Sequence, residues 1–318
     1  MKATLIYNPN AGLLHTVTAD AILNGLMDAG YEPLYRPTSC VDDLPAVLDE
    51  AEGLIVVAGG DGTFRAVAVR MVDRGNPLTV LPMGTANNIA WTFGIQGRPL
   101  DLVAGLENPD VCSMDLGVVE SPWGVYHFLE SIGCGLYADI GEAYGPDRGK
   151  DIPRLIQTIA ETLPNYPGTR VRMTIDGVEV VDDFLLVEAL NTKAFGPRLA
   201  FAPKAEPDDG LLDVVRIHSD VRKSLADYVQ SVVSAPGDLP NVEVTRARQV
   251  DIEPAARPFH VDSLIVPAQS PSTSSGREEN SAQLLHVRLE PKVFEIWVPQ
   301  GPAVGAQGRE RREGERSG

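Results

Sequence analysis

The sequence is short of cysteine, of basic residues and of long apolar runs, and each shortage excludes a class of protein. The three cysteines, Cys40, Cys112 and Cys134, are odd in number and show no CxxC spacing. We therefore expect neither a disulfide framework nor a zinc site. Because free cysteine is usually interior, all three are expected to be small buried residues in a reducing cytoplasm.

Basic residues are outnumbered, with 27 lysines and arginines against 44 acidic residues and a formal net charge of −17. Such a charge repels nucleic acids and anionic membranes at long range, so no nucleic acid partner is expected. No apolar run approaches the ~18 residues that span a bilayer. The apolar stretch at residues 3–7 is too short for a signal peptide. We expect a cytoplasmic protein, with a peripheral position at the membrane and a homodimer left open.

The first part of the chain alternates short apolar runs with segments of helical period. The runs that predict strands are residues 3–7, 31–35, 54–58 and 78–81. A helical pattern over residues 21–29 ends at Gly30, and glycine is typical directly after a last helical turn. This alternation predicts a parallel sheet covered by helices, on which phosphate ligands bind beyond the carboxyl ends of the strands.

After about residue 112 the chain changes to longer β-branched and aromatic runs, which predict a mainly antiparallel β domain. The runs are residues 115–119, 124–132, 171–175, 178–190, 212–217, 242–252 and 259–266. Asp176-Gly177 between two of them is a strong hairpin signal. Two helices are expected, near residues 153–163 and 222–234.

These patterns predict two domains, 1–112 and 113–290. Residues 268–282 are rich in Ser, Gly and Glu, a composition that cannot bury a core, so we expect a mobile loop there. Residues 301–318 are expected to form a disordered tail.

The strongest chemical signal is a glycine turn between a strand and a helix. The apolar run 54–58 leads into Gly59-Gly60-Asp61-Gly62-Thr63, and apolar residues then recur at helical spacing. Glycines let the backbone approach an anion closely, and the helix N-terminus adds partial positive charge. Asp61 would be repelled by phosphate unless it binds Mg²⁺ or takes a proton from an acceptor hydroxyl.

Two further polar turns are expected at the same edge of the sheet. Asn8-Pro9-Asn10-Ala11-Gly12 follows the first strand, and Gly84-Thr85-Ala86-Asn87-Asn88 follows the fourth. Threonine and asparagine cap helices, and their side chains also bind phosphate or ribose. Three such turns together favour a nucleotide site over ordinary tight turns.

The segments NPNAG, GGDGT and PMGTANNIA, in this order and spacing, resemble the diacylglycerol kinase catalytic domain of bacterial lipid kinases and sphingosine kinases. Residues 205–215, AEPDDGLLDVV, look like a second-domain segment of that family. The resemblance implies a phosphofructokinase- or NAD kinase-like α/β domain followed by a β-sandwich domain, with the lipid between them. It also implies that residues 291–300 return to the first domain.

The resemblance places a site for ATP and Mg²⁺ on specific positions. The ATP site comprises Asn8, Thr38, Gly59, Gly60, Asp61, Gly62, Thr63, Arg65, Gly84, Thr85, Asn87 and Asn88, with Ser39 as an alternative to Thr38. A structural magnesium site falls on Glu206, Asp209 and the carbonyl of Leu211. Apart from any family, Asp208-Asp209-Gly210 offers oxygen ligands that suit Mg²⁺, although it also fits a plain Asp-Gly turn.

One departure from the family bears on catalysis. Bacterial members usually carry Asp-Gly-Glu on a late strand, with the glutamate as base, and here the segment reads Asp262-Ser263-Leu264. Leu264 cannot accept a proton. Either Asp262 or Asp61 serves as the base, or the alignment slips here, or the protein binds nucleotide or lipid without efficient transfer. His260 is a further candidate, although a lone histidine in a strand is more often structural.

The sequence therefore predicts an ATP-dependent lipid kinase that phosphorylates a hydroxyl of a lipid such as diacylglycerol, reached at the membrane surface. NAD kinase is a second hypothesis, because it shares the GGDGT turn. A nucleotide- or lipid-binding regulator without transfer activity is a third, motivated by Leu264.

Overall fold

The computed structural model describes residues 1–11, 17–38, 40–144, 151–232, 238–253, 257–268 and 284–300. Four parallel strands and several short helices make up the first part of the chain. In chain order they are β1 Lys2–Tyr7, α1 Ala19–Asp28, β2 Glu32–Tyr35, α2 Leu44–Asp49, β3 Leu54–Gly59, α3 Asp61–Ala68, β4 Leu78–Pro82, α4 Asn88–Thr92 and α5 Pro99–Ala104. The four predicted strands are confirmed to within one residue.

The second part of the chain is mainly β. Its elements are β5 Asp110–Ser121, β6 Gly124–Phe128, β7 Ser131–Gly135, α6 Leu136–Tyr144, α7 Ile152–Thr162, β8 Thr169–Ile175, β9 Val178–Phe184, β10 Leu186–Leu190, β11 Leu212–Ile217, α8 Arg222–Ser231, β12 Glu243–Ala247, β13 Gln249–Glu253, β14 Phe259–Val261, β15 Leu264–Val266 and β16 Leu285–Val298. The hairpin predicted at Asp176-Gly177 is confirmed, with positive φ at both residues.

Ten of these strands form one large sheet and six form a second. The large sheet has the order β2-β1-β3-β4-β16-β13-β8-β9, with β5 paired to β16 and β6 paired to β5; the second runs β12-β11-β10-β7-β14-β15. Strands β1 to β4 pair in parallel, whereas the second sheet is antiparallel. The predicted fold class, an α/β part followed by a mainly antiparallel β-sandwich, is confirmed.

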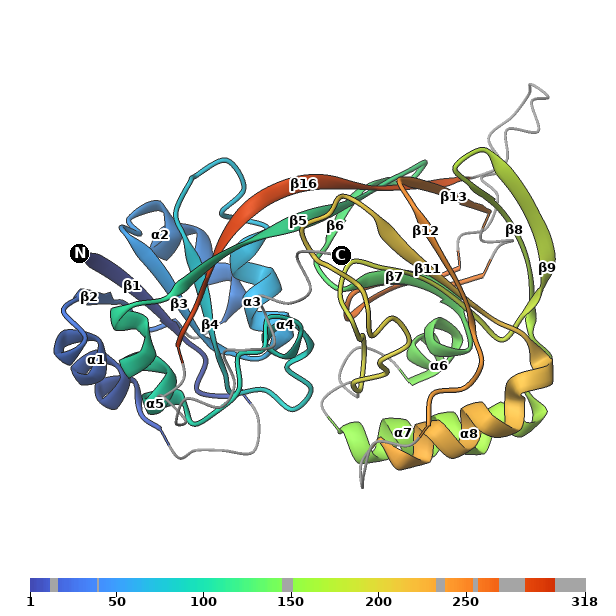
Figure 1. Ribbon diagram of the computed structural model, residues 1–318, viewed down its shortest axis with the longest axis horizontal. Coiled ribbons are helices and arrows are strands. Elements are labelled where there is room, and N and C mark those ends of the chain that lie inside the picture. The colour runs from blue at the N-terminus through green and yellow to red at the C-terminus, as the bar shows by residue number, and fades with distance from the viewer. Residues whose placement is uncertain are drawn as a thin grey trace, which may run out of the picture.

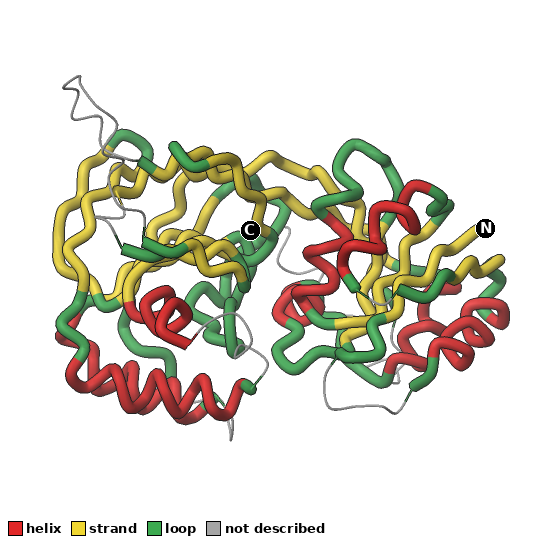
Figure 2. The backbone as a smooth tube through the Cα atoms, turned by 180° about the vertical axis from the view of Figure 1, so that it is seen from behind, coloured by secondary structure: helices red, strands yellow, loops and turns green. Residues whose placement is uncertain are grey.

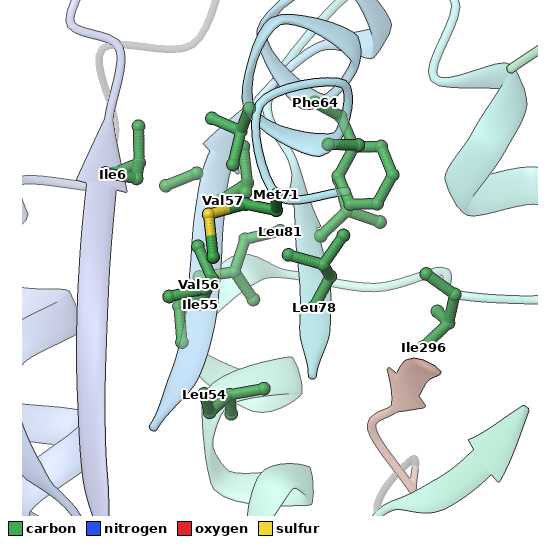
Figure 3. Close-up of a cluster of buried hydrophobic side chains, with 14 of the residues drawn as sticks. Ile6, Leu54, Ile55, Val56, Val57, Phe64, Met71, Leu78, Leu81 and Ile296 are labelled. Carbon is green, nitrogen blue, oxygen red and sulfur yellow. The ribbon is translucent and has the colours of Figure 1, made fainter. Parts of the chain in front are cut away.

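Three apolar clusters hold these layers together. The first surrounds β3, whose six residues are all buried, and Figure 3 shows Phe64 and Met71 lying on the side chains of β3 and β4. The second fills the space between the two sheets. The third lies between the six-stranded sheet and its helices, where α7 and α8 run side by side (Figures 1 and 2).

Two long strands, β5 and β16, run side by side from the first part of the molecule to the second (Figure 1). Near its start β16 pairs with β13, and near its end Ile296 pairs with Leu78 of β4. Both strands thus contribute to both parts. The predicted boundary at residue 112 and the domain assignment of residues 291–300 stay predictions.

Some expectations need correction. Four of the expected runs, 124–132, 178–190, 242–252 and 259–266, are each two strands. The chain bends at Leu129-Glu130, changes sheet at Leu185 and at Arg248, and turns at Asp262-Ser263. Buried residues continue through the first two of these points, so hydrophobicity alone does not reveal them. The cysteines also differ, since Cys40 is exposed, Cys112 is half-buried and only Cys134 is buried. Burial raises the pKa of the Cys134 thiol to about 12.

The segments predicted to be a mobile loop and a tail, 268–282 and 301–318, lie outside the described residues except for Ala268. The backbone N–H of Ala268 donates to the carboxylate of Glu142. No helix among the described residues is long and apolar enough to cross a membrane.

Candidate functional site

The glycine turn after β3 is built from backbone. Gly59 ends the strand, Gly60 precedes α3, and the N–H groups of Thr63 and Phe64 donate to the carbonyl of Gly60. Around Gly62 the space is open, with no atom within 4 Å of a side chain added there. The turn therefore presents a helix N-terminus with room for an anion beside it.

The second glycine turn packs directly on the first. A Cβ added to Gly60 would lie 2.9 Å from the Cα of Gly84, and one added to Gly84 would lie 2.5 Å from the Cα of Gly60. Two turns that are 24 residues apart in the sequence thus touch backbone to backbone, which only glycine permits.

The residue that caps α4 differs from the sequence expectation that an asparagine would do so. Asn87 precedes α4 in a left-handed conformation, but its side chain bonds back to the N–H and carbonyl of Gly84. The N-terminus of α4 is instead capped by Asp61, whose Oδ1 accepts from the N–H of Ile89 at 3.0 Å. Burial raises the pKa of the Asp61 carboxyl, and the nearby charge of Asp262 adds to this.

The turn after β1 completes this edge of the sheet. Nδ2 of Asn8 donates to the Thr63 hydroxyl at 2.8 Å, and Oδ1 of Asn8 accepts from the N–H of Asn10. Thr38 and Thr85 line a cavity at this edge, which is described below and which Asn8 also lines. Gly12 and the alternative residue Ser39 lie outside the described residues.

Asp262 meets this edge from the second part of the chain. It sits at positive φ in the turn between β14 and β15, and its side chain is buried. Its carboxylate accepts hydrogen bonds from the backbone N–H groups of Leu129, Glu130 and Ser131. Nε of Arg65 lies 2.8 Å from Asp262 Oδ2, and Arg65 also donates to the carbonyl of His127. The predicted base is thus fully occupied by partners.

Glu130 is a member of this site that the sequence did not indicate. It lies between β6 and β7, is buried, and lines the same cavity as Asp61 and Asp262. Nδ2 of Asn88 donates to its Oε2 at 2.7 Å. Burial raises the pKa of the Glu130 carboxyl well above its ordinary value, and the charges of Asp61 and Asp262 raise it further.

His260 has a structural setting behind the turn. Nδ1 faces the carbonyl of Asp262 at 3.0 Å and therefore donates to it, while Nε2 lies 2.8 Å from Glu188. One further proton must lie between Nε2 and the carboxyl. Both side chains are fully buried, and the imidazole stacks on Phe195 and meets the edge of Tyr137. This pair fixes the backbone that holds Asp262.

A cavity of about 850 Å³ joins these groups. The turns after β1, β3 and β4 line it from the first part of the chain, together with Glu130, Asp262 and Ser263 from the second. Apolar side chains also line it, chiefly from α6, α7 and β15; they are Tyr137, Ile140, Ile152, Leu155 and Ile265. The cavity therefore combines glycine turns at a helix N-terminus, carboxylates and an apolar wall.

The predicted magnesium ligands lie outside the residues that line this cavity, and the Asp209 carboxylate is engaged with protein partners. Oδ1 of Asp209 accepts from the N–H of Leu211, and Oδ2 pairs with Arg246. The Asp213 carboxyl is nearby, and burial and the charge of Glu206 raise its pKa to about 6. In the part of the chain that the structure describes, no group of three or more His, Cys, Asp or Glu could hold an ion. The assignment of a structural magnesium site to Glu206, Asp209 and Leu211 stays a prediction.

Comparison with known proteins identifies the protein family to which this chain belongs. Residues 2–119 match the model of the diacylglycerol kinase catalytic domain, and residues 154–282 match the YegS C-terminal NAD kinase beta sandwich-like domain. A diacylglycerol kinase of Staphylococcus epidermidis is 32% identical over 225 residues, 67% of this chain and 69% of the relative. That of Bacillus subtilis is 25% identical over 74% of this chain and 78% of the relative.

A solved structure described as a putative diacylglycerol kinase from Bacillus anthracis has the same fold, with a TM-score of 0.67 over 96% of this chain and 97% of that one, at 21% identity. The chain is a lipid kinase by family. It belongs to the family of diacylglycerol kinases and YegS-like lipid kinases.

Proposed function

We propose that this protein is an ATP-dependent lipid kinase that transfers the γ-phosphoryl group of MgATP to a hydroxyl of a lipid such as diacylglycerol. One observation carries the proposal. The two glycine turns that suit phosphate and an apolar wall that suits a hydrocarbon chain line a single cavity. The relatives named diacylglycerol kinase support the same substrate class.

In this proposal the phosphates of ATP bind at the helix N-terminus formed by Gly60 to Thr63, with Asn8, Thr85 and Arg65 around them. Backbone N–H groups and the Arg65 guanidinium balance the phosphate charge, which is the main protein contribution to phosphoryl transfer. The lipid enters from a membrane surface and lays its apolar chain on the residues of α6, α7 and β15.

Asp61 connects the two turns because it caps α4 from the start of α3. In an Asp61→Asn variant the amide oxygen can still accept from Ile89, so the fold is retained while the charge is lost. Because the lost charge lies beside the proposed phosphate site, we expect lipid-dependent ATP turnover to fall by at least roughly 100-fold. Asp101→Asn, on the exposed part of α5, is the matched control and should behave as wild type.

The deciding assay incubates the protein with labelled ATP, Mg²⁺ and separate acceptors, namely diacylglycerol, monoacylglycerol, phosphatidylglycerol, sphingosine and NAD. A phosphorylated lipid is the expected product. Efficient formation of NADP would replace this proposal with an NAD kinase. No product from any acceptor, together with nucleotide binding, would leave a regulator.

A further inference from the structure

The transfer proposed above requires a group that takes the proton of the acceptor hydroxyl, and this inference rests on that proposed function. Leu264 offers only hydrocarbon, is 43% exposed, and lies outside the residues that line the cavity. The base must therefore be sought among the carboxylates and the histidine near the cavity.

Asp262 does not suit the task. Its two carboxylate oxygens receive three backbone N–H groups, and Arg65 lies against Oδ2. These contacts occupy the lone pairs of Asp262 that would have to accept the proton of the lipid hydroxyl. Asp262 instead fixes the backbone of residues 129–131, including the N–H of Glu130 itself, and is a positioning residue.

His260 does not suit it either. Both ring nitrogens are engaged, one with the Asp262 carbonyl and one with Glu188, and the side chain is fully buried outside the cavity lining. Asp61 lines the cavity, but its carboxylate accepts from the N-terminus of α4 and joins the two glycine turns. Asp61 therefore lies on the side of the cavity that the proposal assigns to the phosphates of ATP.

Glu130 combines the three properties that a base needs. It lines the same cavity as the glycine turns and Ser263. Its backbone is held on both sides, since its N–H donates to Asp262 and its carbonyl accepts from the N–H of Asn191. Among the described residues, Asn88 alone donates a hydrogen bond to its carboxyl group. The carboxyl is thus well placed and has spare accepting capacity.

We propose that Glu130 is the general base of this kinase and replaces the glutamate that the segment Asp262-Ser263-Leu264 lacks. Its carboxylate takes the proton as the O–H bond of the lipid hydroxyl breaks. The oxygen forms a bond to the γ-phosphorus of ATP, and the bond from that phosphorus to the β,γ-bridging oxygen breaks. ADP leaves with the bonding electron pair, and Glu130 later releases the proton to water.

The surroundings of Glu130 make it a stronger base than an ordinary carboxylate. The carboxylates of Asp61 and Asp262 and the guanidinium of Arg65 are the nearby charges that act on the Glu130 carboxyl. On the side of the second sheet lie the buried side chains of Tyr137 and Glu188. Burial and the two carboxylates raise the pKa of Glu130, so its charged form is lost at a higher pH than usual. Activity should therefore fall on acidification before an exposed glutamate would titrate.

The test compares Glu130→Gln with the wild type, using whichever lipid the wild type phosphorylates. Glutamine keeps the acceptor for Asn88 but cannot take a proton. We expect kcat to fall by roughly 10² to 10⁴-fold, with KM for ATP changed by less than about threefold. The acidic limb of the wild-type kcat profile should be absent from the residual activity, and Glu130→Asp should retain an intermediate rate. Glu179→Gln, an exposed residue paired with Arg172, is the control.

A folded Glu130→Gln variant within about threefold of wild-type kcat would overturn the inference and leave the lipid kinase proposal standing. A wild-type protein that phosphorylates no lipid would overturn both.

Two measurements decide the matter if Glu130→Gln does not fold. A wild-type kcat whose acidic limb lies no higher in pH than the titration of an ordinary glutamate would contradict a buried carboxylate base. The double variant Ser263→Gly with Leu264→Glu should gain less than about threefold, because a base is already present; a gain above roughly tenfold would mean that the base was missing.

Discussion

The first part of the chain brings two glycine turns to the cavity, and these turns are called the backbone half below. The second part brings Glu130, Asp262 and an apolar wall, and the network around the two carboxylates is called the side-chain half. Gly60 and Gly84 touch with no side chain between them, and phosphate would meet N–H groups. On the other side, Asp262 contacts Arg65 and Glu130 accepts a hydrogen bond from Asn88. Backbone sites depend on local shape, and side-chain sites depend on a network that extends across the fold.

The largest expected effect comes from breaking the network on the side-chain half. Glu188→Ala leaves His260 buried among aromatic rings without its carboxyl partner. We expect the free energy of unfolding to fall by about 3–5 kcal/mol, measured by denaturant unfolding. The double variant Glu188→Leu with His260→Leu should recover most of this loss. A Glu188→Ala protein as stable as wild type would show that the pair has no structural role.

A pair of glycine variants tests the backbone half. Gly60→Ala places a methyl group against the Cα of Gly84, so the turns must separate, at a cost of about 1–3 kcal/mol. The methyl group of Gly62→Ala would have no atom within 4 Å beyond its chain neighbours and the backbone of α3, so the free energy of unfolding should change by less than about 0.5 kcal/mol. It should nevertheless weaken ATP binding in calorimetry, because the methyl group occupies space assigned to phosphate. Normal ATP affinity in Gly62→Ala would place the phosphate elsewhere.

The smallest effect is expected at the first turn. Asn8→Ala removes the hydrogen bond to the Thr63 hydroxyl, which contributes about 1 kcal/mol, and should raise KM for ATP about fivefold. Asn76→Ala is matched in chemistry, because it also removes an amide hydrogen bond, to the carbonyl of Gly53, away from the cavity. It should leave KM unchanged, and an equal rise in both variants would indicate a general loss of order.

The sequence predicts the backbone half well, because each strand, turn and helix there is determined by residues that are adjacent in the chain. Strand, glycine turn and helix follow one another within residues 54–68, and the fourth strand and its turn behave likewise. What it misjudged there was a long-range contact, since the cap of α4 comes from Asp61 and not from Asn87.

The side-chain half could not be predicted in the same way. Glu130 meets Asn88 from 42 residues away, and its backbone meets Asp262 from 132 residues away. Neither spacing leaves a periodic signal in one sequence. Helix α6 was missed for a related reason: it contains Gly141, a poor helix former, at a point where a Cβ would strike Ile265 of β15.

The strands β5 and β16 carry a mechanical consequence for the enzyme. A paired ribbon resists stretching but bends, and here its register breaks between Glu290 and Phe294, where Lys292 has positive φ. The carboxylate of Asp115 accepts from the N–H of Lys292 and also from the N–H of Gly210. Asp115 therefore ties the loop at Gly210 to the point where the register of this ribbon breaks.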